Sequence, residues 1–259
     1  MATEPQRSDS PESVWFWDHY DHAAGEIVDF LAHTGVTLDG KRVADVGCGD
    51  GFIDLGLAHR VPLERLTGFD VNPVDTGHLL RVAGEAGVAT EIPPNVEFVV
   101  SEPQRVPAET NSYDAVVTWS AFEHIAEPIS VLGEINRILR PDGVMFLQLW
   151  PFFHSARGSH LWDWFDHDYP NLLNHEDDVV AQMRANPFGG EDWTEYMIRE
   201  YRHLNRIDVD ELQRSILAAG MVVRRFELLT HAVRIPTELQ RYPLSQLGIG
   251  GVKLVATPS

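Results

Sequence analysis

Five short apolar runs, rich in β-branched residues, follow one another along the first 150 residues and are bounded by turn residues. They cover residues 41–47, 65–71, 95–101, 113–119 and 143–150. Runs of this length that are mostly apolar are typical of strands buried on both faces of a parallel sheet. Longer helical stretches lie between several of them, at residues 52–60, 74–87 and 128–140. The alternation predicts an α/β fold in which a doubly wound parallel sheet carries helices on both faces.

The alternation stops at residue 151. Residues 151–205 have little strand character and many aromatic side chains, and regular order resumes with a predicted helix at 208–220 and predicted strands at 221–230 and 250–258. We therefore predict a flexible tail over 1–12 and a single domain over 13–259. The expected parts of this domain are an N-terminal helix within 13–38, a core over 39–150, an insertion over 151–205, and a C-terminal helix and strands over 206–259.

The chain is strongly acidic, with 39 acidic against 20 basic residues and a formal net charge of −19. Such a surface repels phosphate backbones and anionic lipid headgroups, so we expect no nucleic-acid partner and no membrane partner. The single cysteine excludes an intrachain disulfide and favours a reducing cytoplasm. The polar start of the chain lacks the apolar core of a secretion signal, and the longest apolar run is too short to span a bilayer.

A glycine-rich loop follows the first predicted strand. Gly47, Gly49 and Gly51 stand where strand gives way to helix, so the backbone can approach a ligand closely and present amide groups to it. Asp45 precedes the loop. Asp70 closes the second predicted strand, where a carboxylate can accept hydrogen bonds from ribose hydroxyls. Together these residues predict a nucleoside site, although glycine turns also serve other ligands in doubly wound folds.

Several segments of the chain resemble the class I S-adenosylmethionine-dependent methyltransferases. The resemblance is carried by the loop VADVGCGDG, the ribose-binding segment GFDVNP, the stretch VSEPQRVP, the fourth strand with its turn YDAVVTWSAFEHI, and the approach to the fifth strand LRPDGVMFLQL. It covers residues 41–150 and returns in the last strands. It implies a Rossmann-like sheet of seven strands, mostly parallel, with an antiparallel C-terminal strand. It also implies S-adenosylmethionine as cofactor and S-adenosylhomocysteine as its product.

The resemblance further implies which residues bind the cofactor. They are Asp45, Gly47, Cys48, Gly49, Gly51, Asp70, Val71, Glu102, Trp119 and Ser120. Ser101 and Glu102 stand where glycine and aspartate are commoner in the family, which bears on the adenine contact expected of Glu102. Cys48 is interpreted as a small residue in a tight turn rather than a redox group. Asp45 either fixes the loop or touches the methionine part of the cofactor.

The implied reaction is an in-line displacement at a sulfonium methyl group, for which the protein aligns the reacting atoms and excludes water. A hydroxyl nucleophile also needs a base. His124 is a candidate, and a structural role in its turn is the alternative. The segment WSAF lacks the Asn/Asp-Pro-Pro-aromatic motif of enzymes that methylate DNA bases. Trp119 and Ser120 offer no acidic ligand of the kind that metal-dependent catechol-type enzymes place there, so a small-molecule acceptor is favoured.

The insertion opens with an aromatic and histidine-rich segment, WPFFHSARGSHLWDWFDHDYP, at residues 150–170. Ser159 is a favourable N-cap and Pro170 a natural stop, so we predict a helix over 160–169. The two faces of this helix would carry His160, Asp163 and His167 on one side and Trp162, Phe165 and Tyr169 on the other. We interpret the segment as a lid that turns ionisable groups towards the site. An ordinary core helix with a solvated polar face is the alternative.

The candidates for the chemistry come from this segment and from the fourth strand. The candidate bases are His154, placed first because it lies closest to the fifth strand, then His160, His124 and the acid Asp163. The side chains expected to contact the acceptor are Trp15, Trp17, Phe153, Trp162 and His167. No metal is expected, because no cysteine assists and the insertion lacks the His-x-x-x-His spacing.

These observations predict a cytoplasmic enzyme that methylates a small molecule, at a hydroxyl oxygen of a sugar or natural product. A homodimer is left open. Two alternatives remain. One is a non-catalytic regulator that binds the cofactor, and the other is a methyltransferase of protein or nucleic acid, whose affinity for its partner would weaken with salt.

Overall fold

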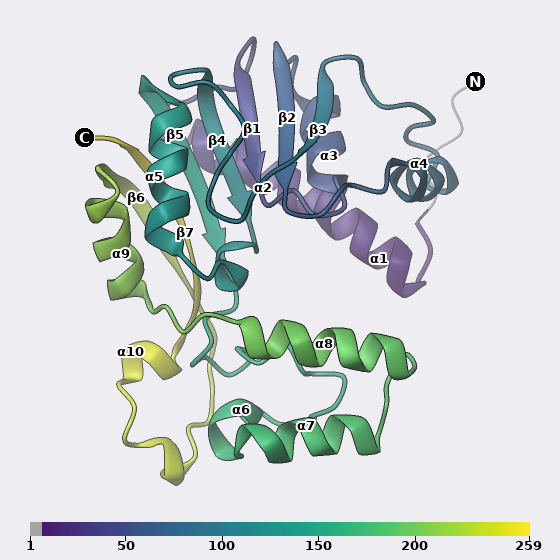
Figure 1. Cartoon of the computed structure of the whole chain (residues 1–259), viewed down its shortest axis with the longest axis vertical. Helices are drawn as coiled ribbons and strands as arrows, with labels where there is room; N and C mark the ends of the chain where they lie inside the picture. Colours follow the sequence, from purple (N-terminus) through teal and green to yellow (C-terminus); the bar gives the residue numbers. More distant parts are fainter. Residues whose placement is uncertain (1–6) are drawn as a thin grey trace.

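A seven-stranded sheet, in the order β3-β2-β1-β4-β5-β7-β6, forms the centre of the protein (Figure 1). The computed structural model describes residues 7–259. The strands are β1 (Arg42–Val46), β2 (Arg65–Asp70), β3 (Val96–Val100), β4 (Tyr113–Trp119), β5 (Leu139–Leu149), β6 (Met221–Thr230) and β7 (Ile249–Pro258). Pairings from β3 to β5 are parallel, whereas β7 runs antiparallel to both β5 and β6. The predicted doubly wound sheet with an antiparallel C-terminal strand is confirmed.

Helices cover both faces of the sheet. Since successive strand residues point to opposite faces, neighbours along one strand pack against different helices. Ala44 and Val116 lie in the cluster that contains the apolar side chains of α5 (Pro128–Ile138) and α9 (Val209–Ala218). Their neighbours Val43 and Val117 lie in the second cluster. That cluster contains residues of α2 (Ala24–Ala32) and α3 (Phe52–Arg60). The strands are therefore apolar on both faces, as their sequences indicate.

The N-terminal segment runs as α1 (Pro11–Trp17), a π-helical stretch η1 (Asp18–Ala23) and α2, without a break in the helical path. Part of the tail predicted over 1–12 lies outside the described residues, and its last two residues already belong to α1. Phe16 packs with Phe52 and Leu79 in a cluster shared with α3 and α4 (Thr76–Glu85). The N-terminal helices are thereby fixed beside the glycine loop.

Residues 151–205, called the lid below, lie opposite the carboxyl ends of the parallel strands (Figure 1). They contain α6 (Pro170–Leu173), α7 (Glu176–Ala185) and α8 (Glu191–His203). The lid has an apolar cluster of its own, in which Leu161 and Phe165 pack with Val179, Met183 and Ile198. Short helices η2 (Phe122–His124), η3 (Thr237–Leu239) and α10 (Leu244–Leu247) complete the described fold. Within residues 7–259, no helix has the length and apolar character to cross a membrane.

The prediction of a helix over 160–169 is wrong, because these residues form turns and bends. His160 and Tyr169 both have φ of +60°, outside the right-handed helical region. Tertiary contacts impose this path: Tyr169 is fully buried and its hydroxyl donates a hydrogen bond to Leu247 O at 3.0 Å. Pro170 does not end a helix but begins α6, where its missing N–H costs nothing. The two helical faces expected for this segment do not exist.

Candidate active site

The glycine loop between β1 and α3 depends on glycine for two different reasons. Gly47, Gly49 and Gly51 all have positive φ, at +85°, +56° and +79°. A Cβ at Gly47 would lie 2.5 Å from Ala121 Cβ, and one at Gly51 would lie 2.8 Å from Phe98 Cζ. A Cβ at Gly49 would meet no atom within 4 Å. The loop is therefore closed beneath Gly47 and Gly51 and open at Gly49, where a ligand can approach the backbone.

Asp70 ends β2 and holds the loop through both carboxylate oxygens. Its Oδ2 accepts a hydrogen bond from the Gly49 N–H at 3.0 Å, and its Oδ1 accepts one from the Asn72 N–H at 2.9 Å. Each oxygen keeps a further lone pair, so the fixed carboxylate fits a pair of ribose hydroxyls. Val71 is exposed beside it. Glu102 is exposed in the turn after β3, two residues beyond Val100, the register partner of Asp70.

Two buried carboxyl groups lie beneath the loop. Asp45 is 1% exposed and Asp54, on α3, is fully buried. Within the described residues, Asp45 Oδ1 and both Asp54 oxygens have no hydrogen-bond partner. Burial, followed by the charges of Asp70 and Asp50, raises the pKa of Asp45 to about 8. An unpaired carboxyl at this place fits a cofactor that carries positive charge, as S-adenosylmethionine does.

Cys48 lies in the same turn and is buried. Burial, together with the charges of Asp54 and Asp45, raises the pKa of its thiol far above the ordinary range. A thiol held protonated is a poor nucleophile and a poor metal ligand. The placement agrees with a small packing residue in a tight turn.

The N-terminal helix covers the loop through one of its two predicted acceptor residues. Trp15 Nε1 donates a hydrogen bond to Asp50 Oδ2 at 2.7 Å, and the indole lies on the His19 ring with centroids 4.0 Å apart. Trp17 instead packs in the apolar cluster with Phe16. Trp15 is therefore placed to contact a ligand at the loop, whereas Trp17 supports the helix.

The carboxyl end of β4 is a strained turn beside the loop. Trp119 stacks on Phe146 with centroids 6.2 Å apart, and the His22 ring approaches Trp119 edge-on. Ser120 has φ of +45° and its hydroxyl donates to Gln148 Oε1 at 2.9 Å. Strained non-glycine positions of this kind are concentrated at functional sites.

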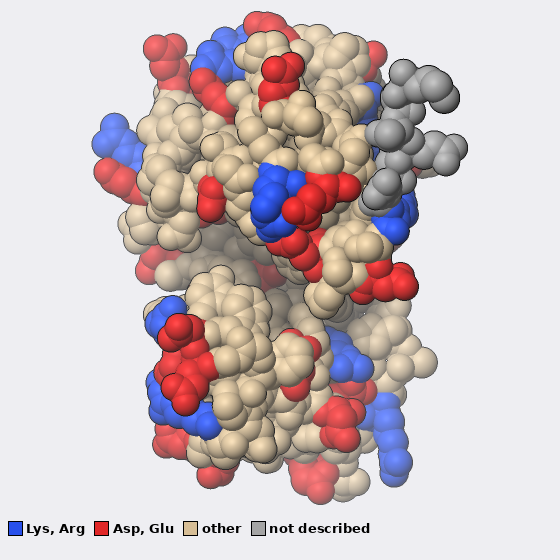
Figure 2. All heavy atoms as spheres, turned by 90° about the vertical axis from the view of Figure 1, so that its right-hand side faces the viewer, with Lys and Arg blue, Asp and Glu red and all other residues tan. Residues whose placement is uncertain are grey.

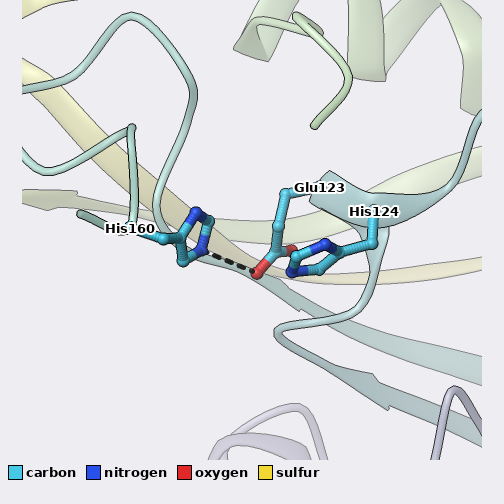
Figure 3. A group of neighbouring side chains, drawn as sticks. All are labelled: Glu123, His124 and His160. Atoms are coloured by element: carbon cyan, nitrogen blue, oxygen red, sulfur yellow. Dashed lines mark ion pairs between the residues drawn. The ribbon is translucent and has the colours of Figure 1, made fainter. Parts of the chain in front are cut away.

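Three ionisable side chains meet where this turn faces the lid (Figure 3). Glu123 and His124 belong to η2, and His160 belongs to the lid; we call these three residues the cleft cluster. His160 Nε2 lies 3.9 Å from Glu123 Oε1. His124 Nδ1 lies 3.2 Å from Glu200 Oε2 of α8. The sheet edge and the lid thus each contribute part of one polar site.

The lid also places an aromatic surface beside the cleft cluster. Trp162 is 43% exposed, and its ring centroid lies 5.7 Å from that of His160 and 6.1 Å from that of Trp150. Figure 2 shows the surface hollowed between the sheet and the lid. Burial, followed by the charge of Glu200, raises the pKa of Tyr196 on α8.

The other predicted site residues of the lid lie elsewhere. His154 makes ring contacts with Phe153 and Tyr242, and burial, with the charge of Arg206, lowers its pKa. Phe153 itself is buried in the apolar cluster of the lid. Asp163 and His167 are exposed. The structure brings only His160 and Trp162 of this segment to the cleft cluster.

Sequence reasoning missed Glu123, Glu200 and Asn205. Glu123 directly precedes the candidate His124 at the carboxyl end of β4, so its position was a usable signal. Asn205 donates from its side chain to Phe122 O and Ile125 O and so fixes the η2 turn. Glu200 and Asn205 reach the site only through the packing of α8, and their sequence surroundings give no indication of it.

The affinity for S-adenosylmethionine is expected to rise with pH through the pKa of Asp45. Below that pKa the cofactor's positive charge faces a neutral acid, and above it a carboxylate, so binding and deprotonation favour each other. Calorimetry at about pH 6.5 and about pH 9 checks this. S-adenosylhomocysteine, which lacks the sulfonium charge, is the control and should gain less affinity; equal gains for the two ligands would contradict the role of Asp45.

The Asp54→Asn variant is expected to be more stable than the parent near neutral pH, by roughly 1–3 kcal/mol. Burial, together with the charge of Asp45, raises the pKa of Asp54 well above its usual value. The unfolded chain therefore loses this proton first, and folded stability falls as pH rises from about 4 towards the folded-state pKa. Asparagine has no such titration. Thermal melting should show a gain in Tm that grows from about pH 4.5 to about pH 7.5, and a gain independent of pH would refute this explanation.

Comparison with known proteins places the chain in a family. A family model described as a methyltransferase domain matches residues 16–225. A ubiquinone biosynthesis O-methyltransferase of Marinobacter nauticus is 33% identical over 114 residues, which make up 43% of this chain and 45% of that protein. The matched region thus spans about half the length of such curated relatives.

Two solved structures share the fold. Geranyl diphosphate methyltransferase in complex with S-adenosylmethionine has a TM-score of 0.56 and 16% identity, over 91% of this chain and 85% of that one. The [4+2]-cyclase SpnF has a TM-score of 0.56 and 18% identity, over 100% of this chain and 88% of that one. At these identities the likeness shows the fold alone. Since the family model spans most of the sequence, the chain belongs to the methyltransferase domain family, and its fold is that of the class I S-adenosylmethionine-dependent methyltransferases, as its glycine loop and strands predicted.

Proposed function

We propose that the protein transfers a methyl group from S-adenosylmethionine to a hydroxyl oxygen of a small acceptor, a sugar or another natural product. The acceptor binds between the carboxyl edge of the sheet and the lid. The observation that carries the proposal is the cleft cluster, because a buried carboxylate and two imidazoles at this edge can remove a proton from a hydroxyl. Methyl transfer to a hydroxyl of high pKa requires the removal of its proton, whereas transfer to an already ionised oxygen does not.

The residues of the chain have separate tasks in this reaction. S-adenosylmethionine supplies a methyl group that is already activated by the sulfonium charge. Asp70 and the Gly49 backbone orient its ribose, and Asp45 faces its positive charge. Trp119 and the lid enclose the methyl group and the acceptor. Within the cleft cluster, His160 and His124 are the groups placed to receive the proton of the acceptor hydroxyl.

The surroundings of the cleft cluster favour an acceptor with a flat or ring-shaped body. Trp162 offers an aromatic face beside His160, and Trp150 lies next to Trp162. Such faces pack well on sugar rings and aromatic systems. The net charge of −19 disfavours anionic acceptors. The relatives include proteins named as ubiquinone biosynthesis O-methyltransferases, which agrees with transfer to oxygen.

Two other functions are compatible with the same fold. A regulator that binds the cofactor without turnover would give no product. A protein named as a [4+2]-cyclase is among the structural neighbours, so proteins of this fold also catalyse other reactions. A methyltransferase of protein or nucleic acid would bind a macromolecule with an affinity that weakens with salt. The acidic surface argues against nucleic acid. Action in the cytoplasm and assembly as a homodimer remain predictions from the sequence.

The test is a panel of sugar, polyketide and phenolic acceptors incubated with the protein and S-adenosylmethionine. We expect S-adenosylhomocysteine to appear together with one methylated product, whose mass and position of methylation identify the oxygen. Methylation at nitrogen or carbon would refute the hydroxyl assignment. Cofactor binding without turnover of any panel member would favour the regulator.

A further inference from the structure

The cleft cluster has the geometry of a site for a metal ion. One potential ligand atom from each of Glu123, His124 and His160 lies within 4.8 Å of the other two, and the three side chains point towards one another (Figure 3). Two ligands of a tetrahedral zinc ion, each at about 2.0–2.1 Å from it, lie about 3.4 Å apart. His160 Nε2 and Glu123 Oε1 are 3.9 Å apart, so a small side-chain rotation brings this pair to that spacing.

The buried carboxylate of Glu123 is an independent reason to expect a cation. Glu123 is 2% exposed, and within the described residues its Oε2 has no hydrogen-bond partner. A carboxylate withdrawn from water without a partner is costly unless a positive charge compensates it. The His160 ring lies 3.9 Å from Glu123 Oε1, beyond hydrogen-bond distance. An ion between the three side chains would supply the missing charge.

The residues around the cluster orient it for this role. His124 Nδ1 lies beside Glu200 Oε2, which leaves Nε2 directed at Glu123 (Figure 3). A carboxylate that holds the far nitrogen of a histidine is the usual support of a metal-binding imidazole. Asn205 fixes the η2 turn through its side chain and through its own N–H, which donates to Glu123 O at 2.8 Å.

We infer that Glu123, His124 and His160 bind one divalent transition-metal ion, such as zinc or manganese, which holds the acceptor oxygen. Two imidazoles and one carboxylate suit these ions, whereas magnesium and calcium prefer oxygen ligands alone. Three protein ligands leave a coordination position open for the acceptor. The sequence predicted no metal because no cysteine assists and the insertion lacks the His-x-x-x-His spacing. The set proposed here instead joins η2 to the lid.

The ion would deepen the proposed function, on which its chemical role rests. A hydroxyl bound to a divalent cation loses its proton more readily. The O–H bond breaks and the proton passes to water. The oxygen lone pair then forms the C–O bond while the C–S bond of the sulfonium breaks, and S-adenosylhomocysteine leaves. With the ion bound, the two histidines serve as its ligands in place of the role as proton acceptors proposed above, and water in the cleft takes the proton.

Metal binding can be measured without any acceptor. The metal-stripped full chain is titrated with Zn²⁺ by calorimetry and with Co²⁺ by visible absorption. We expect one ion per chain, and at least about tenfold weaker binding in His160→Ala and in Glu123→Gln. His203→Ala, which removes an exposed histidine of α8, is the matched control and should bind as the parent does. Melting curves establish that each variant is folded. No saturable binding, or parental affinity in both cluster variants, would overturn the inference.

A second measurement separates this inference from the proposed function. The stripped protein is assayed for methyl transfer with and without Zn²⁺, and the Co²⁺ spectrum is recorded before and after an acceptor is added. Full activity in stripped protein that binds no ion would overturn the inference and leave the proposed function intact. Metal binding at the cluster without turnover of any acceptor would support the site and refute the function. A Co²⁺ spectrum that an accepted substrate does not change would refute direct coordination of the acceptor.

Discussion

The His160→Ala variant is expected to lose about 10²–10⁴-fold in kcat while binding S-adenosylmethionine as tightly as the parent. His160 is the lid's contribution to the cleft cluster, 3.9 Å from Glu123. Without it the acceptor hydroxyl has lost either a proton acceptor or a ligand of the ion that lowers its pKa. The glycine loop and Asp70 keep their contacts, so cofactor affinity is unaffected. Steady-state kinetics gives kcat, and calorimetry gives the affinity for the cofactor.

A second variant tests the histidine that the sequence placed first. His154 packs against Tyr242, and burial lowers the pKa of its ring. Its ring contacts are with Phe153 and Tyr242. We expect His154→Ala to keep kcat within a few-fold. A large loss of kcat in His154→Ala, with a near-normal rate in His160→Ala, would move the chemistry to the other side of the lid.

The strands and crossover helices could be predicted because their causes are local. The helix at 52–60 and the strand at 221–230 have the predicted bounds, since a glycine turn begins the first and Gly220, with φ of +78°, precedes the second. The glycine loop was predictable for the same reason. Its function depends on backbone conformation that only glycine adopts freely.

The lid could not be predicted in the same way, because tertiary contacts decide its path. Ser159 has the chemistry of an N-cap, yet its Oγ accepts from the Leu161 N–H in a tight turn. Tyr169 has a left-handed backbone conformation, which its burial and the hydrogen bond from its hydroxyl to Leu247 O stabilise. The meeting of Glu123 with His160 joins η2 to a turn of the lid, and spacing along the chain carries no information about such a contact.

The Asp70→Ala variant is expected to bind S-adenosylmethionine more weakly, by about 1.5–3 kcal/mol for each hydrogen bond to a ribose hydroxyl that is lost. This is at least about tenfold in Kd. The loop suffers as well, because the Gly49 N–H and the Asn72 N–H both donate to this carboxylate. Asp70→Asn separates the two effects. Its carbonyl oxygen can replace one acceptor, while its amide group cannot accept from the other N–H.

The matched control for Asp70 is Asp75→Asn. Asp75 lies five residues further along and caps α4 by accepting from the His78 N–H at 2.9 Å. Asparagine is an equally good N-cap, so this variant removes the same charge from the same edge of the sheet without removing a ribose contact. We expect Asp75→Asn to bind the cofactor as the parent does, and Asp70→Asn to fall between the parent and Asp70→Ala. If a folded Asp70→Ala protein keeps the parental affinity in calorimetry, the cofactor does not bind through this carboxylate, and the nucleoside site assigned to the loop is wrong.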